Sequence, residues 1–217
     1  MASTLKTEGV LERICQYGVI PVLVPEDTDH VRRLGIALRT GGLPVAEVTF
    51  RTAAAVDALR MLTLNPDMLV GAGSVITPEQ VDVAYHAGAR YIVSPGFTEA
   101  VVERCRRLGL PVIPGVATAT DIIAAIECGI TLVKFFPAEE SGGLNMLRVL
   151  HEPFPGVRFI PTGGINSANA GKYLSQPFVA AVGGSWMIKP EHIRNAAFET
   201  ITSLTAEAIQ VVAKART

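Results

Sequence analysis

The chain lacks the features by which nucleic acids or membranes are usually bound. Its 19 basic and 20 acidic residues give a formal net charge of −1, and there is no long run of one sign. Binding of nucleic acid or an anionic surface through charge requires a basic patch, so we expect neither partner. No uncharged apolar stretch approaches the roughly 18 residues that a membrane-spanning helix needs. A small-molecule substrate is therefore the expected partner.

Cysteine is also scarce. Only Cys15, Cys105 and Cys128 occur, an odd number without a C-x-x-C pair, which is typical of free thiols in a reducing compartment. The N-terminal segment carries Lys6 and Glu8 and has no apolar core of a signal peptide. These features predict a cytoplasmic protein.

Histidine is too sparse and too scattered to suggest a metal site. The four histidines fall in segments expected to be helices or loops, no pair has ligand spacing, and we expect them to face solvent: His30, His86, His151 and His192. The sequence therefore predicts no metal centre.

What the chain does contain is a regular series of eight apolar, β-branched runs. They start 20 to 27 residues apart, at Val19, Val45, Leu69, Tyr91, Pro111, Leu132, Phe159 and Val179. Each interval fits one strand and one helix, and near-continuous apolar strands are typical of parallel sheets covered by helices. Eight such units favour a closed (β/α)8 TIM barrel over an open doubly wound sheet. No linker divides the chain, so we expect one domain over residues 1–217.

Helix signals support this alternation. Thr77 precedes Pro78 as an N-cap, and Gly109 is placed to end a helix before the next strand. The pattern also predicts an extra helix over residues 4–16, ahead of the first strand, and one long terminal helix over residues 190–214.

Polar residues are few at the strand ends, where a barrel of this type has its active face. They are Glu47, Thr49, Arg51, Ser74, Lys134, Thr162 and Ser185. Function is expected among these side chains.

Lys134 stands out because it lies in VKFFPAE, between apolar and aromatic neighbours. An ammonium buried beside Phe135 and Phe136 loses hydration, which is costly without compensation. Strand alternation points Glu47 into the same barrel mouth from the facing strand. A carboxylate opposite offsets part of the cost, while desolvation favours the neutral amine that attacks a carbonyl to form a Schiff base.

Lys134 and Glu47 could instead form a purely structural ion pair, or Lys134 could extend to the rim. Arg51, four residues after Glu47, adds a second cation at the same barrel end and favours a functional site.

Two glycine pairs suggest a phosphate-binding end. PTGGI at 161–165 and VGGSW at 182–186 follow the last two expected strands, where barrels often bind phosphate through backbone N–H groups. Trp186 is either a pocket wall or barrel packing. GAGS at 71–74 lacks the nucleotide-binding spacing, and we interpret it as close packing around a pocket with Ser74 facing the ligand.

Six stretches together resemble the bifunctional 2-keto-3-deoxy-6-phosphogluconate (KDPG) and 4-hydroxy-2-oxoglutarate (KHG) aldolase family. They are EVTFRT (47–52), GAGS (71–74), SPGFTE (94–99), KFFPAE (134–139), PTGGI (161–165) and GGSW (183–186). The resemblance runs from about residue 10 to the end of the chain. The related aldolase for the galactonate-derived phosphate is a poorer match.

This resemblance implies a class I aldolase on a (β/α)8 barrel, a homotrimer that uses neither a metal nor a cofactor. It implies Lys134 as the Schiff-base lysine, Glu47 as the proton shuttle and Arg51 as the ligand of the substrate carboxylate. The remaining implied substrate contacts are Ser74, Pro95, Phe136, Thr162, Gly163, Gly164, Gly183, Gly184 and Ser185. Ser74 replaces a threonine common in the family and keeps the hydroxyl.

The expected reaction is reversible cleavage of 2-dehydro-3-deoxy-6-phosphogluconate to pyruvate and glyceraldehyde 3-phosphate. Cleavage of 4-hydroxy-2-oxoglutarate to pyruvate and glyoxylate is expected beside it. The alternatives are the galactonate-type aldolase, a barrel isomerase or decarboxylase that uses Lys134 only as a charge, and a non-catalytic sugar-phosphate-binding barrel.

Overall fold

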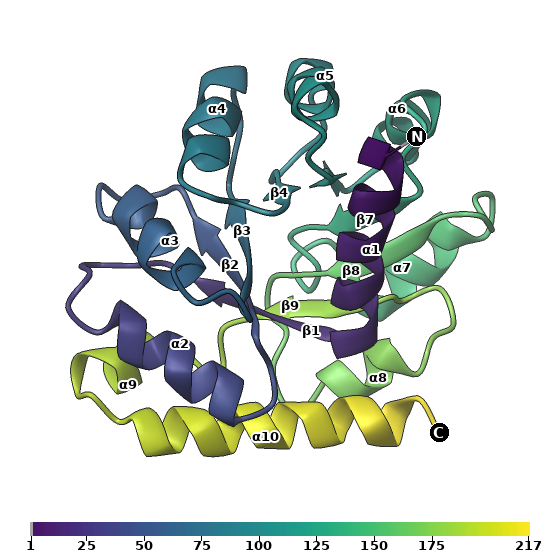
Figure 1. The fold of residues 1–217 in the computed structure, drawn as a ribbon. Helices are drawn as coiled ribbons and strands as arrows, with labels where there is room; N and C mark the ends of the chain where they lie inside the picture. Colours follow the sequence, from purple (N-terminus) through teal and green to yellow (C-terminus); the bar gives the residue numbers. More distant parts are fainter. Residues whose placement is uncertain (1) are drawn as a thin grey trace.

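The computed structural model describes the backbone of residues 2–217 and the side chains from Gly9 onward. Within this range, parallel strands lie at the centre and helices surround them (Figure 1). The strands are β1 (Val19–Leu23), β2 (Val45–Thr49), β3 (Leu69–Gly73), β4 (Ile92–Val93), β5 (Val112–Ile113), β6 (Gly115–Val116), β7 (Leu132–Phe135), β8 (Arg158–Pro161) and β9 (Val182–Gly184).

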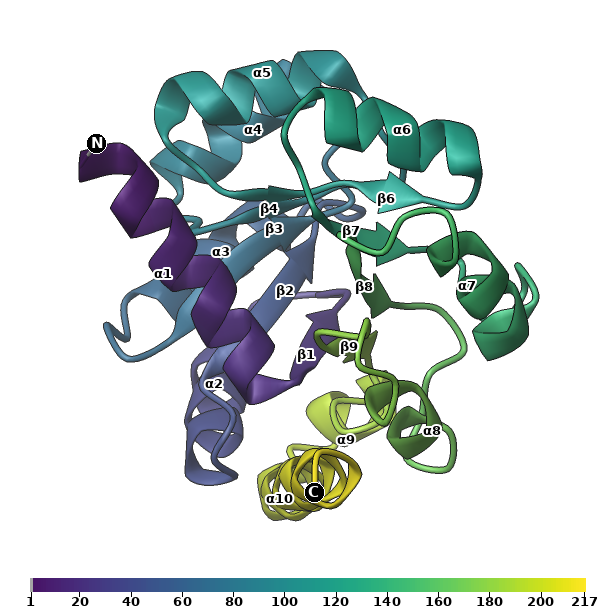
Figure 2. The ribbon, with the colours of Figure 1, turned by 90° about the vertical axis from the view of Figure 1, so that its right-hand side faces the viewer.

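Helices alternate with these strands along the chain. They are α1 (Ala2–Tyr17), α2 (Val31–Thr40), α3 (Ala55–Thr63), α4 (Pro78–His86), α5 (Glu99–Leu108), α6 (Ala119–Glu127), α7 (Gly143–His151), α8 (Ala170–Leu174), α9 (Pro190–Arg194) and α10 (Phe198–Ala215). In Figure 2 the helices after β1 lie outside the strands, and α1 crosses in front of them.

The strands form two curled parallel sheets. One has the order β5-β4-β3-β2-β1-β9 and the other β6-β7-β8. Isolated bridges, Phe159 with Val179 and Thr162 with Gly183, connect the β8 side to the β9 side. The parallel α/β architecture is therefore confirmed, and the sheet curls round a common centre (Figure 2).

The fifth of the eight expected apolar runs forms two short strands in place of one. The fifth apolar run is divided into β5 and β6 by Pro114, which has no N–H to donate to a ladder. Its carbonyl still accepts from Lys134 N at 2.8 Å. The last run also pairs continuously only from Val182, three residues later than expected.

The expected terminal helix over residues 190–214 is also wrong, since the chain breaks it into α9 and α10. Ala196 between them has a positive φ of 51°, and Ala197 N donates a hydrogen bond back to His192 O at 2.9 Å, which closes the first helix.

The predicted helix signals at Thr77 and Gly109 are confirmed. Thr77 Oγ1 accepts from Gln80 N at 3.3 Å, and Gly109 ends α5 with a left-handed φ of 66°.

The core explains why the strands are nearly all apolar. Every residue of β2 and β3 is buried, because one face points to the centre of the curled sheet and the other to the helices. Two of these positions are exceptions to apolar character: Glu47 and Thr49 are buried polar residues. Both exceptions belong to β2, and Glu47 is part of the candidate active site described below.

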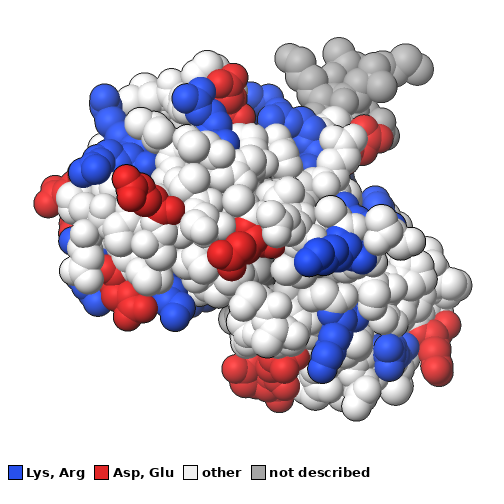
Figure 3. All heavy atoms as spheres, turned by 90° about the horizontal axis from the view of Figure 1, so that it is seen from below, with Lys and Arg blue, Asp and Glu red and all other residues white. Residues whose placement is uncertain are grey.

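The surface is mixed in charge. On the face shown in Figure 3, acidic and basic side chains are interspersed among uncharged ones. None of the described helices is both long and apolar enough to cross a membrane.

Cys105 provides a test of the α5 packing. It is fully buried against the core, and desolvation raises the pKa of its thiol to about 12 from 9.0. The unfolded thiol loses its proton first as pH rises above about 9, so the folded state then holds more protons and stability falls with pH.

We expect Cys105→Val to remove this loss of stability at high pH. In urea unfolding between pH 8.5 and 10.5, the free energy of unfolding of the wild type should decrease relative to the variant. The limiting slope for one group is about 1.4 kcal/mol per pH unit. Parallel pH profiles for the two proteins would show that the thiol is not buried in this way.

Candidate active site

Lys134 and Glu47 meet at the centre of the curled sheet. Lys134 is the third residue of β7 and Glu47 the third of β2, and Lys134 Nζ donates to Glu47 Oε1 at 3.1 Å. The two side chains are only 5 % and 2 % exposed. The structure thus brings together two residues 87 positions apart, as expected of facing strands.

The surroundings of this pair are largely apolar. Lys134 Nζ lies 5.1 Å from the centroid of the Phe136 ring, a distance at which the ring face attracts a cation. Phe135, next in the strand, is fully buried. In such surroundings each charge interacts strongly with the other, and both lose hydration.

Tyr91 is a neighbour of Glu47 that sequence reasoning missed. Its hydroxyl donates to Ala46 O at 2.8 Å, beside Glu47 in the chain. Burial, and secondarily the negative charge of Glu47, raise the pKa of Tyr91 well above its usual 10.0. A tyrosine opening a buried strand was a usable signal, because a buried phenol needs a hydrogen-bond partner.

Arg51 and Ser74 lie together at the ends of β2 and β3. Arg51 Nε donates to Ser74 Oγ at 2.8 Å, and Arg51 is an exposed residue. Ser74 adopts a left-handed φ of 55°, which is uncommon outside glycine. Thr49, another polar residue of this strand, instead uses its hydroxyl to donate to Leu23 O at 3.0 Å, so it ties β2 to β1.

The two glycine stretches lie side by side. Thr162 bridges Gly183, and a Cβ on Gly183 would come within 2.3 Å of Thr162 Oγ1. Gly163 and Gly164 follow with φ values of 101° and 72°, which side-chain-bearing residues rarely adopt. These residues gather at the C-terminal ends of β8 and β9.

The remaining predicted residues border the same end of the sheet. Ser185 is exposed after β9, and Trp186 lies over Gly184, where a Cβ would come within 2.2 Å of its ring. The tryptophan therefore packs on the glycine strand. Pro95 follows β4, and its carbonyl would meet a Cβ on Gly115 at 2.2 Å.

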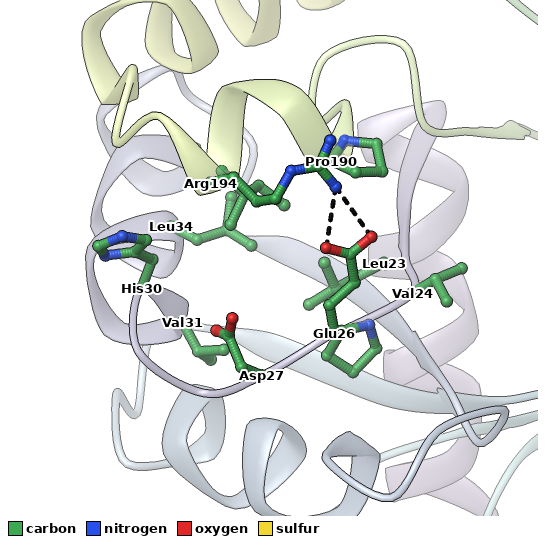
Figure 4. A pocket seen from close by; sticks show the side chains of 11 residues that line it. Leu23, Val24, Glu26, Asp27, His30, Val31, Leu34, Pro190 and Arg194 are labelled. Atoms are coloured by element: carbon green, nitrogen blue, oxygen red, sulfur yellow. Dashed lines mark hydrogen bonds and ion pairs between the residues drawn. The ribbon is translucent and has the colours of Figure 1, made fainter.

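A separate pocket lies between the loop after β1 and α9 (Figure 4). Its rim carries an ion pair in which Arg194 Nη1 contacts both carboxylate oxygens of Glu26, at 2.9 and 3.0 Å. Leu23, Val31 and Leu34 form apolar walls. The pair links the loop after β1 to the end of α9.

No cluster of three or more His, Cys, Asp or Glu side chains is arranged to hold a metal ion among the described residues. The expectation that all four histidines face solvent is wrong for His151. Its ring stacks on Phe178 at 4.2 Å between centroids and meets Phe159 edge-on, and its Nδ1 is buried without a hydrogen-bond partner. Aromatic contacts across α7 and β8 are not visible in the local sequence.

Comparison with known sequences gives one consistent result. A family model described as KDPG and KHG aldolase matches residues 10–204. The chain is 44% identical over 204 residues to the 2-dehydro-3-deoxy-phosphogluconate aldolase of Treponema pallidum, covering 94% of this chain and 97% of that one. It is 39% identical over 193 residues to the KHG/KDPG aldolase of Escherichia coli, covering 88% and 91%.

Solved structures agree with these matches. The KDPG aldolase of Legionella pneumophila, with pyruvate captured at low pH as a covalent carbinolamine intermediate, superposes with a TM-score of 0.88. That protein is 42% identical, and the match covers 91% of this chain and 97% of that one. A native KDPGal structure has a TM-score of 0.81 at 24% identity, which shows likeness of fold.

The buried ion pair leads to a prediction about stability. We expect Lys134→Met to lower the free energy of unfolding by about 3–5 kcal/mol, because it leaves the Glu47 carboxylate buried without a partner. Adding Glu47→Gln should recover most of the lost free energy of unfolding. The single and the double variant are both measured by urea unfolding at pH 7.

The control is Glu26→Gln, which breaks the Glu26–Arg194 pair at the protein surface. Both of those side chains are more than half exposed, so the expected cost is below about 1 kcal/mol. A loss for Lys134→Met no larger than that of this control would contradict the desolvated character of the central pair.

Proposed function

Because the chain belongs to the KDPG and KHG aldolase family, we propose that it is a class I aldolase acting through a Schiff base on Lys134. The observation that carries the proposal is the buried Lys134 side chain, whose Nζ lies 3.1 Å from the Glu47 carboxylate. The reaction is reversible cleavage of 2-dehydro-3-deoxy-6-phosphogluconate to pyruvate and glyceraldehyde 3-phosphate. The name of the Escherichia coli relative supports a second substrate, 4-hydroxy-2-oxoglutarate, which yields pyruvate and glyoxylate.

The first half of the reaction forms the imine. The neutral amine of Lys134 attacks the C2 ketone, and Glu47 moves protons so that the carbinolamine loses water and becomes a protonated imine. The carbinolamine trapped in the Legionella pneumophila relative supports this step.

The second half breaks the C3–C4 bond. Glu47, directly or through water, takes the proton of the C4 hydroxyl, and the C4 oxygen forms the aldehyde as the C3–C4 electron pair moves toward the iminium. Glyceraldehyde 3-phosphate leaves, and the resulting enamine takes a proton at C3. Hydrolysis of the imine then releases pyruvate and restores the free amine.

Substrate recognition is assigned to the ends of the strands. Arg51 Nε is held by Ser74, and its two terminal nitrogens, which have no recorded partner among the described side chains, offer two-point binding of the substrate carboxylate. Pro95 and Phe136 border the pyruvyl group. The phosphate is bound at the glycine-rich end by Thr162, Gly163, Gly164, Gly183, Gly184 and Ser185.

We further propose that the sheet closes into a (β/α)8 barrel in which β5 and β6 act as one interrupted strand. The Phe159–Val179 and Thr162–Gly183 bridges support closure on the other side. The whole chain, residues 1–217, forms this single domain and assembles as a cytoplasmic homotrimer. Sedimentation of the purified protein tests the assembly, and a monomer would contradict it.

Trapping the imine tests the mechanism. Sodium borohydride added with pyruvate should reduce the imine to a stable secondary amine, seen as a mass increase that peptide mapping places on Lys134. The matched control is Lys172, an exposed lysine of α8: Lys172→Met should leave trapping intact, whereas Lys134→Met should abolish it. A label on another residue, or none, removes the covalent mechanism.

Glu47→Gln tests the proton shuttle. The amide keeps the size of the side chain and cannot exchange a proton at neutral pH, so turnover should fall by about 100- to 10,000-fold. Borohydride trapping with pyruvate should persist during long incubation, because the lysine is retained. Pyruvate release in a coupled assay measures turnover, and an undiminished rate would exclude Glu47 from proton transfer.

A further inference from the structure

Strand β3 presents two glycines toward the centre of the curled sheet, beside Glu47. In the parallel pairing of β2 and β3, Glu47 lies opposite Gly71 and Thr49 opposite Gly73. Residues two apart in a strand share a face, so beyond Leu69 this face of β3 carries no side chains at Gly71 and Gly73. The space is occupied by side chains from β2 and from the residue before β4.

The close approaches identify the occupants. A Cβ on Gly71 would come within 2.3 Å of the Tyr91 ring. A Cβ on Gly73 would come within 2.2 Å of Glu47 Oε1, 2.6 Å of its Cγ and 2.7 Å of its Cδ. Glu47 therefore lies directly against the backbone of Gly73.

The glycine at 73 is not explained by its backbone conformation. It ends β3 and is not among the residues with a positive φ, so an alanine could adopt the same backbone without strain. The three heavy atoms nearest to an added Cβ all belong to Glu47. The tightest steric constraint at this position thus comes from that side chain.

An added methyl group at residue 73 would meet Glu47 from Cγ to Oε1, so this side chain would have to shift, and a side chain yields more readily than backbone does. Displacement would carry Oε1 away from its position 3.1 Å from Lys134 Nζ. Such a substitution should therefore affect chemistry more than folding.

We propose that Gly73 is a positioning residue for the aldol reaction, because the absence of a side chain there sets the Glu47 carboxylate against Lys134. This inference rests on the function proposed for Glu47. Gly73 does not touch substrate and acts only through the acid.

Gly73→Ala is the first test. Turnover should fall on the order of 100-fold, as expected when a catalytic group is misplaced by about 1 Å. The KM for the phosphorylated substrate should change little, because Arg51 and the glycine-rich end are not involved. Borohydride trapping of pyruvate on Lys134 should persist during long incubation. Wild-type turnover, or loss of trapping in the folded variant, would overturn the proposal.

A double-mutant cycle shows whether Gly73 acts through Glu47. In a Glu47→Gln background, Gly73→Ala should cause little further loss of turnover, because the group it misplaces is already inactive. Independent, multiplicative losses would overturn the proposal, since they would require an effect that bypasses Glu47.

Stability measurements keep the test decisive if Gly73→Ala folds poorly. In a Glu47→Ala background the obstructing side chain is gone, so Gly73→Ala should cost little further stability there. The cost is compared within each background, because Glu47→Ala alone already leaves Lys134 buried without its partner. An equal cost in both backgrounds would overturn the proposal. This cycle needs no activity, so its result is independent of whether pyruvate is trapped on Lys134 at all.

The matched control is Gly41→Ala, at the end of α2. Gly41 has a negative φ of −73°, and its added Cβ would meet Thr205 Cβ at 2.6 Å and the backbone oxygen of Thr202 at 2.8 Å. That crowding lies against α10 and involves backbone, so it should lower stability while leaving the turnover of the folded protein unchanged. A turnover loss matching that of Gly73→Ala would show that crowding anywhere has this effect, and would overturn the proposal.

Discussion

The ion pair between Lys134 and Glu47 is the interaction on which the arrangement of this molecule depends. Burying either charge alone is strongly unfavourable, and their attraction offsets the loss of hydration only while the two atoms stay within hydrogen-bond distance. Strands β2 and β7 must therefore face one another at a fixed separation. A parallel sheet that curls far enough to bring these strands opposite meets that requirement.

The same pair connects fold and chemistry. In water a lysine amine is protonated and a poor nucleophile, and a glutamate beside it exchanges protons with solvent. Inside apolar walls the lysine ammonium donates to the Glu47 carboxylate, which is a group able to receive its proton. Under the proposed mechanism, proton transfer between the two is internal to the site, as alternating steps of imine formation, bond cleavage and hydrolysis require.

Much of this could be predicted from local sequence pattern. Strand starts were located closely because apolar β-branched runs with intervening helix signals are local properties, as β1, β2, β3 and β7 show. The meeting of Lys134 and Glu47 followed from strand alternation and from the position of opposite strands in a ring. The choice of polar residues at the strand ends as candidate site residues followed in the same way from the predicted parallel α/β architecture.

What could not be predicted depends on contacts between distant segments. Ala196 separates α9 from α10 with a positive φ, which its residue type does not predict. His151 stacks on Phe178, and the sequence pattern around either residue gives no sign of the other. The space beside Gly73 depends on the length of a side chain on the neighbouring strand. The sequence shows a glycine there, but only the structure shows what fills its place.

The stretch from Gly71 to Ser74 shows how such contacts concentrate at the site. Gly71 accommodates the Tyr91 ring, Gly73 the Glu47 carboxylate, and Ser74 accepts the Arg51 hydrogen bond while its own backbone is left-handed. A left-handed serine costs on the order of 1 kcal/mol, and glycine within a strand weakens it. These costs are tolerable because β3 is buried along its full length and packs against β2 and β4. A stable central strand can therefore give up local stability at its end, where it lies against the residues proposed to do the chemistry.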